Sequence, residues 1–130
     1  FCVDDHKKIQ FLQNPACDIC FQPFLTATEG AQLCGRCLIK KPFYFKAMSV
    51  IKYDENSKSL ITKFKYSDRT YIAKYFANLM FNHSKEILPN IDFIAPVPLH
   101  KLRLISRKYN QSALIANHLA KFSNIKTIFL

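Results

Sequence analysis

Four cysteines near the start of the chain have the type and the spacing of a metal site. Cys17 and Cys20 form one C-x2-C pair, and Cys34 and Cys37 form a second pair a short segment later. Two thiolates at this spacing reach one metal ion from a tight turn, and two such turns complete the tetrahedron of sulfur ligands that Zn²⁺ prefers. The pattern predicts a closed, structural zinc site that leaves no coordination position open for catalysis.

Disulfides and a redox C-x-x-C pair are the competing uses of these cysteines, and both fit less well. The chain has five cysteines, an odd number, and no charged-then-apolar secretory signal opens it. Cys2 is left over, either as a spare thiol or as a remnant of another metal pair with Asp5 at the partner spacing. Gly35 can adopt the positive φ that a metal-binding turn often requires.

A second stretch that could do chemistry is "APVPLHKLRLISRKYNQ", residues 95–111. Two prolines stiffen its start, and His100, Lys101, Arg103 and Arg107 follow. Arginine offers a bidentate fork to a phosphate, lysine a point charge, and histidine a hydrogen bond. The stretch is therefore either an anion-binding loop or a solvated loop with its basic side chains in water, and position alone supports both equally.

The charge balance favours anionic partners. Nineteen Lys and Arg stand against nine Asp and Glu, for a net charge of +10, and Asp92 is the last acidic residue. A second acid-free stretch, residues 30–53, contains Arg36, Lys40 and Lys41, which we expect to offset the charge of four metal-bound thiolates. The partners that suit this balance are phosphate-bearing small molecules, nucleic acid or acidic lipid.

The chain is too apolar for global disorder, yet no run is long enough for a membrane span. Hydrophobic residues make up 49% of the sequence. No apolar stretch approaches the roughly 20 residues that a membrane-spanning helix needs. We therefore expect a folded cytoplasmic protein.

Hydrophobic periodicity predicts three helices that must position these groups. The first begins at Ser57 as N-cap, and the third runs from Gln111 to Phe122 behind Asn110 as N-cap. The second ends before Pro89 and buries one apolar face, made of Ile72, Tyr75, Phe76, Leu79 and Met80.

Three apolar runs predict strands, at residues 46–53, 91–97 and 125–130. The last two, with the third helix between them, form a βαβ unit. The basic stretch then lies at the carboxyl end of a parallel strand, which is where open α/β sheets bind their ligands.

These motifs together resemble the ComF family of competence-associated, phosphoribosyltransferase-like proteins. The resemblance runs from about Cys17 to the end and rests on the cysteine pairs, "KFKYSDR" at 63–69 and "DFIAPVPLHKLRLISRKYNQSALIANHLA" at 92–120. It implies an α/β protein with a small N-terminal zinc ribbon over residues 1–42. The first part of a type I phosphoribosyltransferase-like domain, with an incomplete parallel sheet, would follow over residues 43–130.

The resemblance also implies roles for single residues. Pro96 to Lys101, including His100, would form the loop that meets pyrophosphate in such enzymes, and the basic turn and helix start after it would hold Arg103, Arg107, Asn110 and Gln111. Relatives are linked to natural transformation and thus to the handling of imported single-stranded DNA.

The parts of a full member that bind the ribose phosphate have no counterpart here. They would be an acidic pair and a Thr/Gly-rich turn, whereas this sequence has two glycines, Gly30 and Gly35, and no acid after Asp92. We expect no transferase activity from this chain alone, Mg²⁺ only with a complete catalytic domain, and either low stability or a partner chain over the open sheet edge. The alternatives are a single-stranded nucleic-acid-binding protein of DNA uptake and a decayed fragment without activity.

Overall fold

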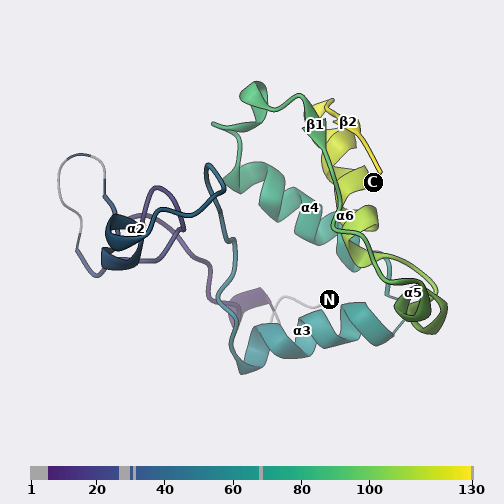
Figure 1. The fold of residues 1–130 in the computed structure, drawn as a ribbon. Helices are drawn as coiled ribbons and strands as arrows, with labels where there is room; N and C mark the ends of the chain where they lie inside the picture. Colours follow the sequence, from purple (N-terminus) through teal and green to yellow (C-terminus); the bar gives the residue numbers. More distant parts are fainter. Residues whose placement is uncertain (1–5, 27–29, 31, 68, 130) are drawn as a thin grey trace.

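A computed structural model describes residues 6–26, 30, 32–67 and 69–129. Helices α3 (Glu55–Tyr66), α4 (Ile72–His83) and α6 (Gln111–Ser123) lie together, and the cysteine-bearing segment with α2 (Gly35–Ile39) extends from one side of them (Figure 1). Within the described part of the chain, no helix is long and apolar enough to cross a membrane. The expectations for Cys2 and Asp5 fall outside the described residues.

The start of α3 is fixed by a reciprocal capping box. The Asp54 carboxylate accepts a hydrogen bond from the Ser57 backbone N–H at 2.9 Å, and the Ser57 hydroxyl accepts one from the Asp54 backbone N–H at 2.8 Å. The bond from the Ser57 N–H is the main reason why the pKa of Asp54 is lowered. The prediction of Ser57 as N-cap is wrong, because Asp54 takes that position and Ser57 is the buried third residue of the helix.

The core lies where α3, α4 and the segment before the first cysteine meet. Ile9, Leu60, Phe64, Ile72 and Ala73 form one buried cluster. Partly buried apolar residues pack around this cluster from α4, from α6 and from the segments before α3 and α6. They are Phe11, Ile51, Tyr75, Phe76, Tyr109, Leu114 and Ile115.

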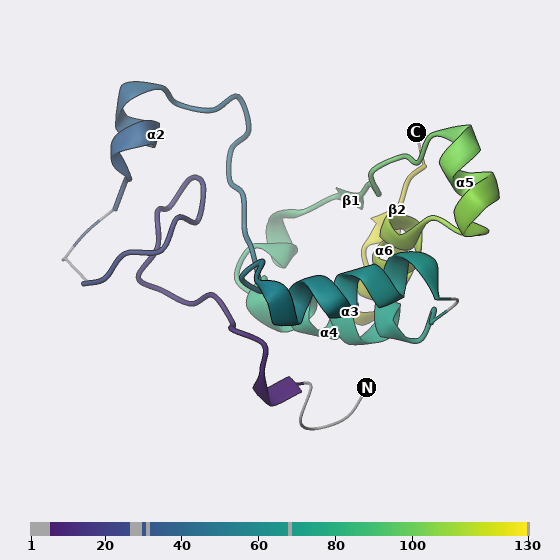
Figure 2. The same cartoon turned by 90° about the horizontal axis from the view of Figure 1, so that it is seen from below.

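The apolar face predicted for α4 is confirmed except at its end. Met80, in the last turn, is 39% exposed, so its assignment to the buried face is wrong. Ala73 and Ala77 are instead completely buried. Small side chains permit a close approach, and α4 packs against α6 along this face (Figure 2).

The predicted βαβ unit is present, but its strands are short. β1 (Phe93–Ile94) pairs in parallel with β2 (Lys126–Thr127), with Phe93 opposite Lys126 and Ile94 opposite Thr127. α6 makes the crossover between them and packs against β2. The described fold is mostly helical with a small two-stranded parallel sheet, so the expected larger α/β sheet is present only as this pair.

The strand predicted at residues 46–53 is wrong. Only Ile51 makes a bridge, antiparallel to Phe11, with flanking backbone hydrogen bonds from Leu12 to Val50 (2.9 Å) and from Lys52 to Gln10 (2.9 Å). A strand needs a ladder of paired residues, and between these two described segments the pairing stops at this single bridge.

Candidate metal centre and basic loop

Two different local structures present the cysteine pairs. Cys17 and Cys20 lie in a tight turn closed by an antiparallel bridge between Ala16 and Pro23 and by a hydrogen bond from the Cys17 N–H to the Gln22 carbonyl at 2.8 Å. Cys34 is the N-cap residue of α2, and Cys37 lies inside that helix.

Two described residues of this unit have a positive φ, Phe21 and Gly30 (φ of 90°). Gly35, which could adopt one, is the first residue of α2 and does not. Phe21, directly after the first pair, has φ of 62° and turns the chain back. Its buried ring packs edge-on against His83 of α4, with the centroids 5.2 Å apart, and this contact anchors the turn to the helices.

The four sulfur atoms are close enough for one metal ion. They all lie within 4.8 Å of one another, and the Cys20 and Cys34 sulfurs are 3.6 Å apart. A tetrahedron with Zn–S bonds of about 2.3 Å has edges of about 3.8 Å, which agrees with this separation. All four cysteines are free thiols, and Cys17 and Cys37 are buried. The predicted cluster is confirmed as a group suited to hold a metal ion.

The protein environment lowers the pKa of some of these thiols and raises that of others. Burial raises the pKa of Cys17, but hydrogen bonds from the backbone N–H groups of Cys20, Cys34 and Ile19 outweigh it and lower that pKa to about 6. Burial and the neighbouring sulfurs raise the pKa of Cys37 to about 12. Four thiolates therefore need a bound cation, and a divalent metal ion supplies that charge.

The segment after Pro98 contains a helix that the sequence reasoning missed. α5 (Lys101–Arg107) begins at His100, whose ring Nδ1 accepts a hydrogen bond from the Leu102 N–H at 3.4 Å, and it ends at Lys108 in the left-handed region. α5 contains neither proline nor glycine, which is the signal that could have revealed it.

The loop that leads into α5 is tied to the start of α6. The Val97 N–H donates to the Ser112 hydroxyl at 3.0 Å, and the Asn110 side-chain amide donates to the Val97 carbonyl at 3.1 Å. Asn110 also caps α6, accepting hydrogen bonds from the backbone N–H groups of Ser112 (2.9 Å) and Ala113 (3.4 Å), which confirms the predicted cap. The loop is thus held against the helix that follows it.

The remaining candidate residues fall into two groups. Lys101 and Arg103 are exposed on α5. Arg107 stacks on the Tyr66 ring at 5.0 Å and donates hydrogen bonds to the Tyr66 hydroxyl at 3.1 Å and to the Gln111 side-chain oxygen at 3.5 Å. Gln111 is buried and donates to the Lys65 carbonyl at 3.2 Å. Arg107 and Gln111 therefore join α5 and α6 to the end of α3.

Comparison with curated proteins finds relatives over most of this chain. Competence protein F of Haemophilus influenzae is 30% identical over 103 residues, which is 75% of this chain and 45% of that protein. The DNA utilization protein YhgH of Escherichia coli K12 is 33% identical over 109 residues (80% of this chain, 48% of that protein), and YhgH of Salmonella typhi is 34% identical over 107 residues (78% and 47%). The chain spans about half the length of these relatives. Neither a family model nor a solved structure matches it.

Proposed function

We propose that this chain, a homologue of Competence protein F and of the DNA utilization protein YhgH, is the metal-stabilised, phosphate-binding part of a phosphoribosyltransferase-like protein of DNA uptake. The resemblance to the ComF family in the sequence motifs is confirmed by these relatives. The division into a zinc ribbon over 1–42 and part of a transferase-like domain over 43–130 belongs to this proposal.

The proposed cofactor is Zn²⁺, held by the thiolates of Cys17, Cys20, Cys34 and Cys37. Four protein ligands fill a tetrahedral zinc ion, so its role is to fix the fold of the cysteine unit. Arg36, Lys40 and Lys41 line a pocket together with Cys20 and Cys37, where their charge offsets that of the thiolates. Mg²⁺ enters only where a complete catalytic domain is present.

The position of the 95–100 loop is the observation that carries the phosphate-binding proposal. The loop leaves the carboxyl end of β1, inside a parallel βαβ unit, and hydrogen bonds to the start of α6 hold it there. Ligands of open α/β sheets bind at this end of the strands. The ligand that suits the site is the pyrophosphate group of phosphoribosyl pyrophosphate.

Lys101 and Arg103 are the cations best placed to meet that ligand. Within the described part of the chain, neither side chain makes a hydrogen bond or an ion pair that would have to be broken, and both are exposed. Arg107 keeps the adjoining turn in position through Tyr66 and Gln111. His100 is the last residue of the 95–100 loop and the N-cap residue of α5.

Replacement of both exposed cations, Lys101→Gln with Arg103→Gln, is expected to weaken pyrophosphate binding by about tenfold, because each solvent-exposed charge contributes at most about 1 kcal/mol. Isothermal titration of the chain with pyrophosphate measures the change. Lys121→Gln is the matched control, since Lys121 is an exposed lysine on α6 outside this segment. Equal affinity of the double variant and the control would remove this segment from the proposal.

We also propose that a partner chain covers the exposed part of the small sheet. Phe93 of β1 is 54% exposed, and Phe129, two residues beyond the end of β2, is 63% exposed. Large apolar side chains next to unpaired strand edges are surfaces that a partner chain can cover.

A second candidate function, binding of single-stranded DNA, is favoured by the segment after α2. Phe43 and Phe45 are fully or almost fully exposed (107% and 93%), and Tyr44 is 47% exposed. Exposed lysines flank the three rings, namely Lys40, Lys41 and Lys46. Bases stack on exposed aromatic rings, and neighbouring cations attract the backbone phosphates.

Replacement of Phe43 and Phe45 together by alanine is expected to weaken binding of a fluorescent oligothymidine, since each stacked base contributes about 1–3 kcal/mol. Fluorescence anisotropy measures the affinity, and the affinity of the unaltered chain should fall steeply as salt rises. Leu38→Ala is the control, because Leu38 is an exposed apolar residue of the same unit without a ring. Weak oligothymidine binding that changes neither with salt nor with the Phe43 and Phe45 substitutions contradicts this candidate.

A further inference from the structure

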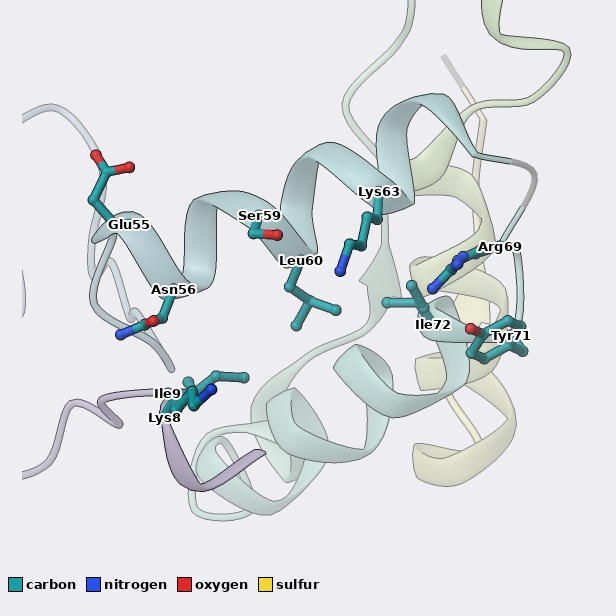
Figure 3. Close-up of a pocket in the computed structure, with 10 residues that line it drawn as sticks. All are labelled: Lys8, Ile9, Glu55, Asn56, Ser59, Leu60, Lys63, Arg69, Tyr71 and Ile72. Atoms are coloured by element: carbon teal, nitrogen blue, oxygen red, sulfur yellow. The ribbon is translucent and has the colours of Figure 1, made fainter. Parts of the chain in front are cut away.

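A pocket of about 220 Å³ lies along one side of α3 (Figure 3), and its lining includes neither the cysteines nor any residue of the 95–111 stretch. One stripe of α3, from Glu55 to Lys63, forms one wall. The opposite walls come from Lys8 and Ile9 before the cysteine unit and from residues 69–72 at the start of α4. Three separate parts of the chain thus meet around this pocket.

The floor and the rim of this pocket differ in chemistry. Ile9, Leu60 and Ile72 belong to the buried core, with exposed fractions of 6%, 7% and 2%, and they give the pocket an apolar floor. The rim is polar, and its cations are Lys8, Lys63 and Arg69. Asn56 and Ser59 add an amide and a hydroxyl on the α3 side.

Two of the three rim cations, Lys63 and Arg69, lie at one end of the pocket, and Lys8 lies toward the other. Figure 3 shows Lys63 and Arg69 on either side of Ile72, with Glu55 at the opposite end. Glu55, the acidic residue of the lining, is paired with Lys58 at 3.5 Å. Within the described residues, the side chains of Lys63 and Arg69 make no hydrogen bond or ion pair with the protein. Both cations are therefore available to an anion.

We propose that this pocket binds a small phosphomonoester, with its phosphate between Lys63 and Arg69 and its carbon skeleton over Leu60. Guanidinium and ammonium groups are the usual protein partners of a phosphate. Asn56 and Ser59 can bond the hydroxyl groups of the organic part. The pocket volume of about 220 Å³ is smaller than the roughly 300–1,000 Å³ of sites for drug-sized ligands, which limits the organic part to a few carbon atoms.

This assignment also accounts for a motif that neither the metal centre nor the basic loop explains. Lys63 and Arg69 are the first and the last residue of "KFKYSDR". Inside the motif, Phe64 belongs to the core and Tyr66 holds Arg107. The side chains of the two terminal cations make no such contact with other described residues, and both line the pocket.

Titration of the isotope-labelled chain with glycerol 3-phosphate, inorganic phosphate and glycerol, followed by amide NMR shifts, tests the proposal. Glycerol 3-phosphate is expected to give saturable shifts at residues 56–63 and 69–72 and to bind more tightly than inorganic phosphate, whereas glycerol leaves the spectrum unchanged. Lys63→Gln and Arg69→Gln are each expected to weaken glycerol 3-phosphate binding by about fivefold.

Lys65→Gln is the matched control, because Lys65 is an exposed cation of the same helix that does not line the pocket. Thermal melting of each variant verifies that the exposed substitutions leave the fold intact. Shifts confined to residues 96–111, an absence of saturable shifts, or equal affinities for inorganic phosphate and glycerol 3-phosphate would overturn the proposal. Shifts confined to residues 96–111 would support phosphate binding at Lys101 and Arg103 while excluding it here, and the other two outcomes leave the pyrophosphate titration undecided, so the two proposals can fail separately.

Discussion

Replacement of Cys37 by serine is expected to abolish metal binding and to unfold the cysteine unit while α3, α4 and α6 remain folded. Cys37 is buried and lies within 4.8 Å of the other three sulfurs, so no other described group can take its place. Structural zinc contributes about 10–16 kcal/mol to the folding of small domains near neutral pH, far more than the few apolar contacts of this unit. Metal analysis of the purified chain and amide NMR signals of residues 15–40 measure the two effects.

Acid and metal chelators should also remove the metal ion and unfold the cysteine unit, as Cys37→Ser does. Protons compete with the metal for the thiolates, so the affinity for the metal falls as the pH falls. Cys2→Ser is the control, because Cys2 has no C-x2-C partner in the sequence and its loss should leave one zinc ion per chain. Undiminished zinc in Cys37→Ser, or a well-folded unit without metal, contradicts the assignment.

Replacement of Phe64 by alanine is expected to destabilise the helical part by about 3–5 kcal/mol, the usual cost of truncating a buried phenylalanine. Phe64 is 4% exposed, and its ring contacts those of Phe76 and Tyr109 at centroid distances of 5.6 and 6.4 Å. Few small domains are more stable than about 5–15 kcal/mol, so this loss takes most of the margin. Urea unfolding followed by circular dichroism measures it.

The control for Phe64→Ala should remove an aromatic ring that is not part of the core. Tyr53→Ala removes an aromatic ring that is 70% exposed just before α3 and is expected to change stability by no more than a few tenths of a kcal/mol. A loss of less than about 1 kcal/mol in Phe64→Ala would mean that α3 does not pack on α4 and Tyr109 as described.

The features that the sequence predicted correctly are those that local pattern determines. The apolar spacing of α4 and α6 repeats at the helical period, and Asn110 caps α6 because its short amide reaches two backbone N–H groups. The cysteine cluster follows from two C-x2-C pairs, since each pair is pre-set for one metal ion.

The features that the sequence did not reveal depend on contacts between distant residues. The apolar run at 46–53 has the composition of a strand, but its pairing with the segment around Phe11 is limited to one bridge. α5 escaped notice because Leu102, Leu104 and Ile105 are all exposed, so no apolar stripe distinguishes a buried face. Likewise, the pocket beside α3 is lined by Lys8 at one end and by Lys63 and Arg69 at the other, an arrangement that no local pattern encodes.

The contact of Arg107 with Tyr66 couples two regions that are far apart in the sequence. A ligand that draws the Arg107 guanidinium away must break its stacking on Tyr66 and loosen the last turn of α3, where Gln111 also bonds the Lys65 carbonyl. If a ligand bound at α5 changes the affinity of a second ligand at that turn, the second ligand changes the affinity at α5 by the same factor, because thermodynamic linkage is reciprocal. Lys63 lies in the same turn, so the end of α3 is a place where occupancy on one side of the molecule can be communicated to the other.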